Sequence, residues 1–539
     1  MNKCVKEILI FNYCYYNMKV IITTSGIGSR LGDLTKYTNK SLMKVGDKFA
    51  IDYIFDLYKK HNIDFIVTIG YKGDIVKQYL NMVYSDLRIS YVEIDNYDGE
   101  GSSLGYSLLQ VHKQLELNEP FIFHCNDTII MEEIDFNNLN NNTLLGYKYG
   151  DSNNYASLNL NGNTVRKINE KGEIDYDCLY TGWSYIKDFH IFWDSLEQLY
   201  ISNTYSSSLS DIHCYKEMMD KNIVFKSLII NNYFDIGTTN IFLKTNGNEL
   251  FKKKFNVLTK SEESISFHSD KVIKFFHNKN IIRKRIERSK YFNKDIIPKI
   301  FSTSDNFFMM ELIDSPPLSD IYEHGLVLEL LEWSRINLWK ETICENFFDN
   351  CKKFYYDKTI DRINLFINKK EHIDYEIINN IKIGKINELI DKIDFQSLCT
   401  NTPSNFHGDF ILDNILYKNN NFYLIDWRED FGGDKESGDM YYDLSKLQHN
   451  IYFNHKNIEQ GLFFIDYIDE YSCKLDLKCN YFLIKQLDEF NKFINKYNYD
   501  KRKINILTSL IWINMAPLHE YPLSNFLFNF GKYNLHLSI

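Results

Sequence analysis

The sequence lacks the features that define several common protein classes. No stretch of about 18 uncharged apolar residues occurs, so we expect no membrane span. The 10 cysteines include no CxxC pair, so neither a zinc site nor a redox dithiol is supported, and reduced thiols in the cytoplasm are the simplest interpretation. The first 17 residues carry several charges and no small-residue cleavage site, which argues against a secretory signal. We therefore predict a cytoplasmic chain in which residues 1–17 are an N-terminal extension.

Long basic runs are also missing. The formal net charge is −10, and the densest basic run is FKKKF at residues 251–255. Because nucleic-acid binding relies on clustered positive charge, we expect no nucleic-acid partner. Hydrophobic residues make up 44% of the chain and aromatics 16%, which is enough to build packed cores. A length of 539 residues favours more than one domain.

Three polar landmarks stand close together near the C-terminal end, within the segment 405–447. They are Asp409 in the sequence HGD, Asn414 in DN, and Asp426 at the end of the apolar run YLID. A phosphoryl transfer from Mg-ATP needs one carboxylate beside the acceptor hydroxyl, and an amide and a second carboxylate to hold magnesium. We predict a loop, a strand at 415–417, a turn and a strand at 422–425 that delivers Asp426. The alternative is that each residue only forms a turn or a cap.

This segment resembles the catalytic segment of the aminoglycoside phosphotransferase and choline kinase family. The resemblance implies that Asp409 is catalytic and that Asn414 and Asp426 bind Mg²⁺. It also places Lys274, within VIKFF, at the position of the lysine that binds the ATP phosphates, with Glu287 as its partner on the next helix. Asp443, in GDMYYDLSKL, is interpreted as a structural residue that caps a helix and braces the catalytic loop.

A second pattern lies at the other end of the chain, in MKVIITTSGIGSRLGDLTKYTNKSLMKV at 18–45. An apolar strand at 20–22 leads into a loop with glycines, followed by Arg30 and Lys40. Small residues let backbone N–H groups approach phosphates, and the two cations can neutralise a triphosphate. The pattern therefore predicts a nucleotide-binding loop.

The same segment resembles the opening of the sugar-phosphate nucleotidyltransferase family, which has the form GxGxRLxxLTxxxPKxLxxV. In this chain Asp33 and Asn39 stand where that family has proline, which affects the rigidity of the loop and the placement of the lysine. The resemblance makes Arg30 and Lys40 catalytic and Gly26 and Gly28 nucleotide-binding. The residues in register are Gly26, Gly28, Arg30, Leu31, Leu34, Thr35, Lys40, Leu42 and Val45.

Later segments match the same family. Asp127 ends the segment FIFHCND, and Asp235 is the second residue of FDIGT; the resemblance makes both Mg²⁺ ligands. Paired carboxylates from distant strand ends suit a hard cation that bridges phosphates. Ser102, in EGSS, occupies the place of the loop that contacts the base.

The acceptor side of this resemblance rests on shorter matches. Glu170 and Lys171, in INEKGE, match an EKP element in which the glutamate binds the acceptor and the lysine binds its phosphate. Gly172 replaces the proline of that element. Gly182, in YTG, stands where the family has an acceptor-binding strand.

These patterns predict an α/β chain with two enzyme domains. Alternating strand-like and helical runs at 18–244 indicate a Rossmann-like nucleotidyltransferase domain with a mostly parallel sheet. A polar linker is expected at 245–260. A bilobal, protein-kinase-like α+β domain is expected at 261–539. Tryptophans 333, 339 and 512 line an acceptor pocket or, as aromatic stripes more often do, belong to the core.

Taken together, the sequence predicts a bifunctional enzyme. The C-terminal domain would phosphorylate a small hydroxylated metabolite with ATP, and the N-terminal domain would join it to a nucleotide from an NTP, with CTP favoured. The product would be an activated phosphocholine-like or sugar-phosphate compound for decorating surface glycans or lipids. Two alternatives stay open: an enzyme with one activity whose other domain is regulatory, and a non-catalytic scaffold.

Overall fold

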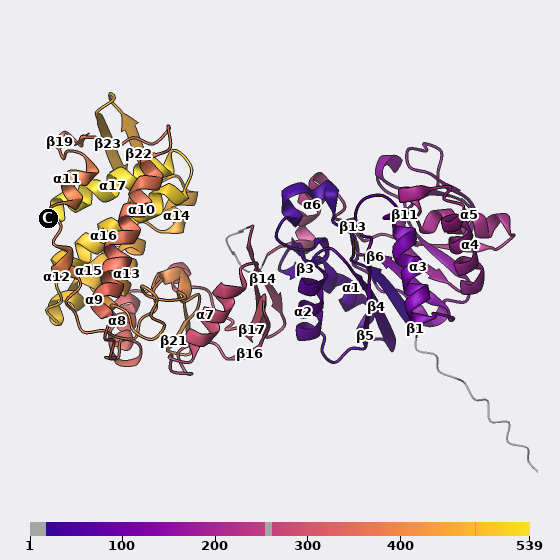
Figure 1. Cartoon of the computed structure of the whole chain (residues 1–539), viewed down its shortest axis with the longest axis horizontal. Coiled ribbons are helices and arrows are strands. Elements are labelled where there is room, and N and C mark those ends of the chain that lie inside the picture. Colours follow the sequence, from indigo (N-terminus) through magenta and orange to yellow (C-terminus); the bar gives the residue numbers. More distant parts are fainter. Residues whose placement is uncertain (1–17, 254–260, 480) are drawn as a thin grey trace, which may run out of the picture. The chain divides into compact units, whose positions relative to one another are not determined.

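The computed structural model describes residues 18–253, 261–479 and 481–539, so the predicted extension at 1–17 lies outside the described residues. The chain divides into two compact units (Figure 1). The first unit runs to Asn278 and also contains Ser302–Met309; the second contains Lys279–Phe301 and Met310–Ile539. Among the described residues, no helix combines the length and the apolar character needed to cross a membrane.

The first unit is built on a nine-stranded sheet of order β5-β4-β1-β6-β11-β8-β12-β10-β9. Strands β5, β4, β1 and β6 are parallel, whereas β11 runs antiparallel to both β6 and β8. The sheet is therefore mixed and not mostly parallel: the part that carries the glycine loop and the pair β8–β12 are parallel, whereas the other pairs are antiparallel. The strands are β1 (Met18–Thr23), β4 (Ile63–Ile69), β5 (Ile89–Glu93), β6 (Phe121–Cys125), β8 (Asn142–Tyr147), β9 (Ser157–Asn161), β10 (Thr164–Asn169), β11 (Cys178–Ile186) and β12 (Phe225–Ile230).

Helices cover both faces of this sheet. Alternate residues of a strand point to opposite faces, and accordingly Val20 and Ile22 join one hydrophobic cluster while Ile21 joins another. All three are fully buried, which explains the uninterrupted apolar run of β1. The helices of this unit are α1 (Ala50–Tyr58), α2 (Gly73–Val83), α3 (Leu104–Leu115), α4 (Phe189–Ile201), α5 (Asp211–Asp220) and α6 (Thr239–Asn246).

The predicted linker at 245–260 begins inside helix α6. The short helix η6 (Glu249–Phe251) follows, and Phe251 is only 2% exposed because it packs on Tyr53 and Phe234. Residues 254–260 of the predicted linker lie outside the described residues. The domain boundaries stay predictions.

The hairpin of β14 (Glu263–His268) and β15 (Lys271–Phe276) belongs to the first unit, although the sequence analysis assigns it to the second domain. Phe275, on β15, joins the core cluster that contains α1 and α2. The buried carboxylate of Asp52 accepts hydrogen bonds from the hydroxyls of Tyr79 (2.8 Å) and Tyr84 (3.0 Å), and it lies 3.1 Å from Nε2 of His268. Apolar packing and this polar cluster hold the hairpin on the first unit.

The second unit is mostly helical. Its predicted hairpin near residue 420 forms, from β20 (Ile415–Lys418) and β21 (Asn421–Leu424). It also contains a four-stranded sheet of order β19-β18-β23-β22 that the sequence analysis does not predict. The strands of that sheet are β18 (Ile377–Ile378), β19 (Ile381–Lys382), β22 (Phe463–Tyr467) and β23 (Ser472–Leu477). The longer helices are α7 (Lys279–Ser289), α8 (Leu326–Asn337), α10 (Lys358–Ile367), α13 (Met440–Tyr452), α15 (Tyr481–Lys496), α16 (Lys501–Met515) and α17 (Leu523–Ser538).

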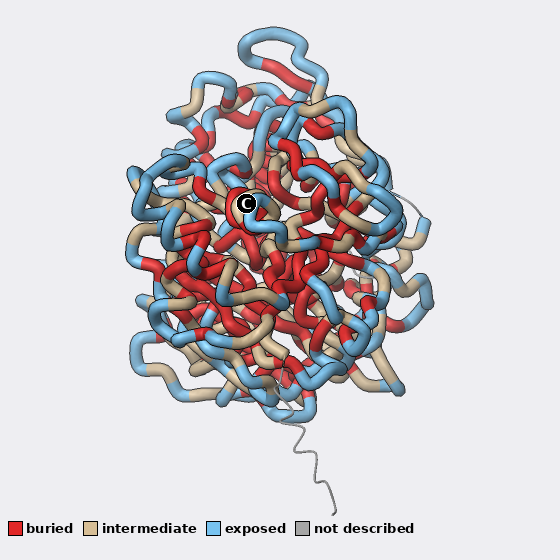
Figure 2. Tube along the Cα trace, turned by 90° about the vertical axis from the view of Figure 1, so that its right-hand side faces the viewer, coloured by how far each residue is buried: buried red, intermediate tan, exposed pale blue. Residues whose placement is uncertain are grey.

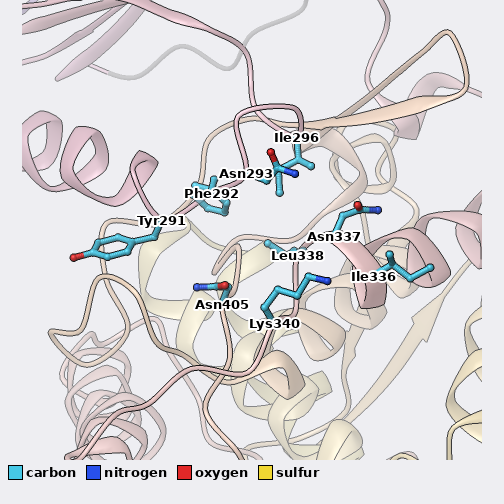
Figure 3. A pocket seen from close by; sticks show the side chains of 9 residues that line it. All are labelled: Tyr291, Phe292, Asn293, Ile296, Ile336, Asn337, Leu338, Lys340 and Asn405. Carbon is cyan, nitrogen blue, oxygen red and sulfur yellow. The ribbon is translucent and has the colours of Figure 1, made fainter.

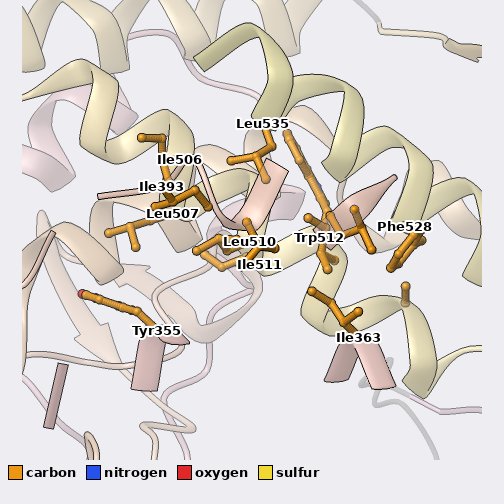
Figure 4. Close-up of a cluster of buried hydrophobic side chains, with 14 of the residues drawn as sticks. Tyr355, Ile363, Ile393, Ile506, Leu507, Leu510, Ile511, Trp512, Phe528 and Leu535 are labelled. Carbon is orange, nitrogen blue, oxygen red and sulfur yellow. The ribbon is translucent and has the colours of Figure 1, made fainter. Parts of the chain in front are cut away.

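The tryptophans of the second unit belong mainly to its core. Trp512 is 2% exposed and lies in a cluster with Phe528 and Leu535, between helices α16 and α17 (Figure 4). Trp339 is also buried, in a separate cluster, and Trp333 packs against the edge of that cluster. Buried residues lie mostly in the interior, and many exposed residues lie in the outer loops (Figure 2).

Candidate functional sites

The glycine loop of the first unit follows β1 directly. Gly28 has a φ of 73°, and a Cβ atom there would lie 3.3 Å from Thr35 and 3.4 Å from Lys40, so the turn requires glycine. Gly26 is exposed and has open space around it, which leaves its backbone accessible to a ligand. Arg30 is exposed on the short helix η1 (Ser29–Thr35). The loop therefore presents backbone and one cation to solvent.

Asn39, just before Lys40, is held by several hydrogen bonds. Its fully buried amide donates hydrogen bonds to the carbonyl oxygens of Thr24 (2.9 Å) and Tyr71 (2.7 Å). Its Oδ1 accepts from the backbone N–H of Ser41 at 2.9 Å. These bonds connect the segment before Lys40 to the residues that follow β1 and β4. They therefore fix the position of the Lys40 backbone.

Lys40 and the two predicted metal ligands come together beyond the sheet edge. The Nζ atom of Lys40 lies 2.6 Å from Oδ2 of Asp127. A ribbon formed by β7 (Thr128–Ile130) and β13 (Tyr233–Asp235) pairs Asp235 with Thr128, next to Asp127. A short ribbon therefore brings together two carboxylates that are 108 positions apart in the sequence (235 − 127).

The two carboxylates face a common point at Gly237. A Cβ atom on Gly237 would lie 2.9 Å from Oδ1 of Asp235 and 3.3 Å from Oδ2 of Asp127. Tyr155, which the sequence analysis misses, donates from its hydroxyl to Oδ2 of Asp235 at 2.6 Å. No local motif marks Tyr155, because its contact is made across 80 positions.

Electrostatics distinguish the two aspartates. Burial alone would raise the pKa of Asp127, but the charges of Lys40 and Arg30 outweigh it and hold that pKa below its ordinary value. Burial and the negative charge of Asp127 raise the pKa of Asp235. A second carboxylate held beside an ionised one is a site that favours a cation.

The donor set fits Mg²⁺ bound together with a nucleotide. No group of three or more His, Cys, Asp or Glu side chains is arranged to hold a metal in the described part of the chain. Mg²⁺ is commonly bound by one or two carboxylates, with phosphate oxygens of the substrate and water as the other ligands. Asp127 and Asp235 match that pattern.

The predicted base and acceptor residues all lie in the first unit. The hydroxyl of Ser102 donates to the carbonyl of Gly99 at 2.7 Å, in the loop before α3. Gly182 has a φ of 82°, and a Cβ atom there would meet Cys125 at 3.1 Å, so β11 can pass close to the end of β6 only with glycine. The carboxylate of Glu170 is 57% exposed and pairs with Lys216, and Lys171 is exposed.

The second unit carries the other candidate site, in the loop before the hairpin. The Nδ2 atom of Asn414 donates to Oδ2 of Asp409 at 3.1 Å, which leaves Oδ1 of Asn414 without a protein partner among the described residues. Lys446, on α13, forms an ion pair with Asp409 at 2.8 Å, and the Asp409 side chain remains 39% exposed. Burial would raise the pKa of Asp409, but Lys446, His407 and Arg428 hold it well below its usual value. Asp409 is therefore ionised and suited to orienting a hydroxyl.

Asp443 braces this loop, as predicted, but it does not cap the helix, because it lies inside α13 and the N-cap residue is Asp439, whose side chain accepts from the backbone N–H of Tyr441. The Asp443 carboxylate accepts hydrogen bonds from the backbone N–H groups of His407 and Gly408, both at 2.7 Å, and from Nε1 of Trp339 at 3.0 Å. Burial raises the pKa of Asp443 to about 6. Arg288 supports the loop from another direction, with its guanidinium 3.0 Å from the carbonyl oxygen of His407.

We expect Asp443→Ala to lower the free energy of unfolding of the second unit by about 3 kcal/mol, because three buried donors lose their acceptor. Urea denaturation followed by tryptophan fluorescence measures this change. Asp443→Asn keeps an acceptor oxygen and should lose less. An alanine variant as stable as the unchanged chain would show that Asp443 does not brace the loop.

The remaining predicted kinase residues fall in different units. Lys274 is buried on β15 of the first unit, whereas Glu287, on α7 of the second unit, pairs with Lys435. The pairing of Lys274 with Glu287 stays a prediction. Asp426 follows β21 with a φ of 58° and lies 3.5 Å from the guanidinium of Arg285.

The second unit also contains a hollow of about 350 Å³ (Figure 3). Its lining includes Tyr291, Phe292 and Asn405, and none of Asp409, Asn414 or Asp426. The hollow is therefore separate from the candidate catalytic residues.

A glycine loop, a lysine and two facing aspartates beyond the edge of a Rossmann-like sheet are the features expected of the nucleotidyltransferase class. The comparisons support that class for the N-terminal part of the chain. The chain is similar to glucose-1-phosphate cytidylyltransferase of Salmonella typhimurium, with 24% identity over 181 residues, which cover 29% of this chain and 70% of that protein. It is also similar to D-glycero-alpha-D-manno-heptose 1-phosphate guanylyltransferase of Campylobacter jejuni, with 24% identity over 229 residues, 41% of this chain and 95% of that protein.

The chain is also similar to a curated choline-phosphate cytidylyltransferase and to a solved structure of such an enzyme. Choline-phosphate cytidylyltransferase of Streptococcus pneumoniae is 32% identical over 104 residues, which are 18% of this chain and 41% of that protein. A solved structure of CTP:phosphocholine cytidylyltransferase from Streptococcus pneumoniae is 22% identical and covers 43% of this chain and 98% of that one, with a TM-score of 0.37. No family model matches the chain.

Proposed function

We propose that the first unit transfers a nucleotidyl group, with CTP as the favoured donor, to the phosphate of a small metabolite and releases pyrophosphate. The observation that carries this proposal is the ion pair of Lys40 with Asp127, whose carboxylate faces that of Asp235. The cytidylyltransferases among the relatives support CTP as the donor.

In this reaction an oxygen of the acceptor phosphate bonds to the α-phosphorus of the NTP, and the bond to the leaving pyrophosphate breaks. Lys40 and Arg30 would offset negative charge on the triphosphate, and the backbone at Gly26 and Gly28 would approach its oxygens. Asp127 and Asp235 would hold Mg²⁺, which supplies further positive charge against the phosphates. Ser102 would contact the base, and Glu170, Lys171 and Gly182 would face the acceptor.

We further propose that the second unit phosphorylates a hydroxylated metabolite with ATP, which makes the chain bifunctional. The contact of Asn414 with Asp409 carries this proposal, because it places an amide oxygen beside a carboxylate on a loop that Asp443 braces. Asp409 would orient the acceptor hydroxyl, while Asn414 and Asp426 would hold Mg²⁺.

The test is to incubate the protein with Mg-ATP, each NTP in turn and a panel of metabolites, and to follow ADP and pyrophosphate separately. The proposal expects both products. ADP without pyrophosphate, or the reverse, would favour an enzyme with one activity and a regulatory second unit. Neither product, with nucleotide binding intact, would favour a non-catalytic scaffold.

Lys171→Ala is expected to raise the KM for the phosphorylated acceptor by about 10-fold or more, because a charge-assisted contact to phosphate is lost. Steady-state pyrophosphate release measures the change, and ADP formation should be unaffected. Lys167→Ala removes the same charge from an exposed position of β10 and serves as the control. Equal effects of the two substitutions would show that Lys171 has no specific role.

A further inference from the structure

Four cationic side chains of the second unit lie close enough to interact electrostatically with one another or with Asp409. Lys446 contacts the carboxylate of Asp409 at 2.8 Å, and Arg428 packs against the neighbouring residue, where a Cβ atom on Gly408 would lie 2.6 Å from the Cβ of Arg428. Lys358, on α10, has its Nζ atom 4.3 Å from the ring centre of Phe354, and the guanidinium of Arg428 lies 4.9 Å from the same ring. Arg362 follows Lys358 by one helical turn. We call Lys358, Arg362, Arg428 and Lys446 the cationic cluster.

Three of the four cations of this cluster have no ion-pair partner in the described part of the chain. Within the described ranges, no carboxylate forms an ion pair with Lys358, Arg362 or Arg428, whereas Lys446 pairs only with Asp409. Burial and the neighbouring charges of Arg428, Lys446 and Arg362 lower the pKa of Lys358 well below its ordinary value. Partly buried like charges repel one another and favour the binding of an anion.

A buried histidine beside the cluster is a second, independent observation. His449 is 4% exposed, and neither of its ring nitrogens has a hydrogen-bond partner in the described part of the chain. It follows Lys446 by three positions on α13, so both lie on the same face of the helix. A buried imidazole without a partner costs free energy, and a polar group of a ligand would satisfy it.

We propose that the acceptor whose hydroxyl is oriented by Asp409 also carries an anionic group, either a carboxylate or a phosphate. This anionic group binds the cationic cluster. The inference rests on the proposed kinase function of the second unit. The acceptor oxygen would bond to the γ-phosphorus of ATP as the bond to the β-phosphate oxygen breaks, ADP leaves, and the hydroxyl proton passes to Asp409 and then to solvent. The arrangement disfavours a quaternary ammonium such as choline, because that cation would enter a region of positive charge.

The triphosphate of ATP is the other anion that could use these charges. The acceptor is favoured because Lys446 contacts Asp409, the residue assigned to the acceptor hydroxyl, and not the metal ligands. Lys358 and Arg362 come from α10, outside the hairpin and loop that supply Asn414 and Asp426. The two sources of anion are separated by the kinetic test.

The first arm compares acceptors of similar size and different charge with the full chain and Mg-ATP. D-glycerate and sn-glycerol 3-phosphate are the anionic probes, glycerol is neutral, and choline is cationic. We expect kcat/KM for at least one anionic probe to exceed that for glycerol by about 10-fold or more, since charge-assisted bonds are added. Preference for glycerol or choline would overturn the proposal and leave the kinase assignment intact.

The second arm uses Lys358→Gln and Arg362→Gln, with Lys370→Gln, an exposed position beyond the end of α10, as the control. Calorimetry with D-glycerate and inorganic phosphate, without ATP, should show affinities weakened by about 10-fold in the first two variants and unchanged in the control. Lys358→Arg should retain binding.

The outcomes separate the two proposals. A rise in the KM for ATP with an unchanged KM for the acceptor would assign the cluster to the triphosphate and overturn the inference, as would anion affinities that none of the substitutions alters. Anion binding through the cluster without ADP formation from any acceptor would support the anion site and contradict the kinase function.

Discussion

Asp127→Ala should reduce pyrophosphate release by at least about 10²-fold, with little change in the fold. The substitution removes the carboxylate that pairs with Lys40 and leaves Asp235 as the only carboxylate of the candidate metal site. Lys40 would then lack the partner that positions it, so both the metal and the lysine would be misplaced. Asp235→Ala should have an effect of similar size, because the site needs both carboxylates.

Magnesium titration provides the decisive control for these variants. Raising the Mg²⁺ concentration should not restore the rate, because a missing ligand changes the geometry as well as the affinity. Asp86→Ala, at an exposed position of the same unit, should keep full activity. If only one of the two aspartates matters, or if excess Mg²⁺ restores activity, the site with two carboxylate ligands is wrong.

Asp409→Asn should reduce ADP formation with the acceptor by about 10²–10⁴-fold, while pyrophosphate release from an added phosphorylated acceptor continues. The amide has nearly the same shape, so the contacts of the loop through Asp443 should persist. The lost feature is the negative charge that orients the hydroxyl and accepts its proton. The ion pair with Lys446 is lost at the same time.

The comparison variant for Asp409→Asn is Asp391→Asn, which makes the same chemical change at an exposed position of the second unit. Single-turnover measurements with ATP in excess separate the chemical step from product release. Unchanged turnover in Asp409→Asn would end the assignment of this residue to the reaction.

The sequence predicts best the parts of each site that follow strand ends or short loops. Asp127 could be predicted because an apolar run precedes it, and the hairpin around residues 415–425 could be predicted from two short strands with a turn between them. Such patterns are local, so they can be recognised in the sequence without the tertiary structure.

Residues that act through long-range contacts could not be predicted in this way. Tyr155 reaches Asp235 across 80 positions, and nothing in the sequence around it indicates that contact. Asn39 could be identified only as a departure from proline, whereas its three hydrogen-bond partners explain why the departure is tolerated. Lys446 stands in the segment DLSKL, and that it pairs with Asp409 is visible only in the fold.

For the hairpin of β14 and β15, the sequence predicts the strands but not their packing partner. Its alternating pattern predicts the strands correctly, but not the unit on which they pack. That choice is made by side chains such as Phe275 and His268, which meet α1 and α2 far away in the sequence. Hydrophobic periodicity identifies a face that will be buried and does not identify its partner.

The central claim is that one chain carries out two successive steps, and a single reaction mixture tests it most directly. The intact protein is incubated with Mg-ATP, CTP and one unphosphorylated metabolite at a time, and ADP and pyrophosphate are followed together. We predict that the metabolite that drives ADP formation also drives pyrophosphate release after a lag, and that Asp409→Asn abolishes both products unless the phosphorylated metabolite is supplied. Pyrophosphate release that depends on a chemically unrelated acceptor would contradict the account.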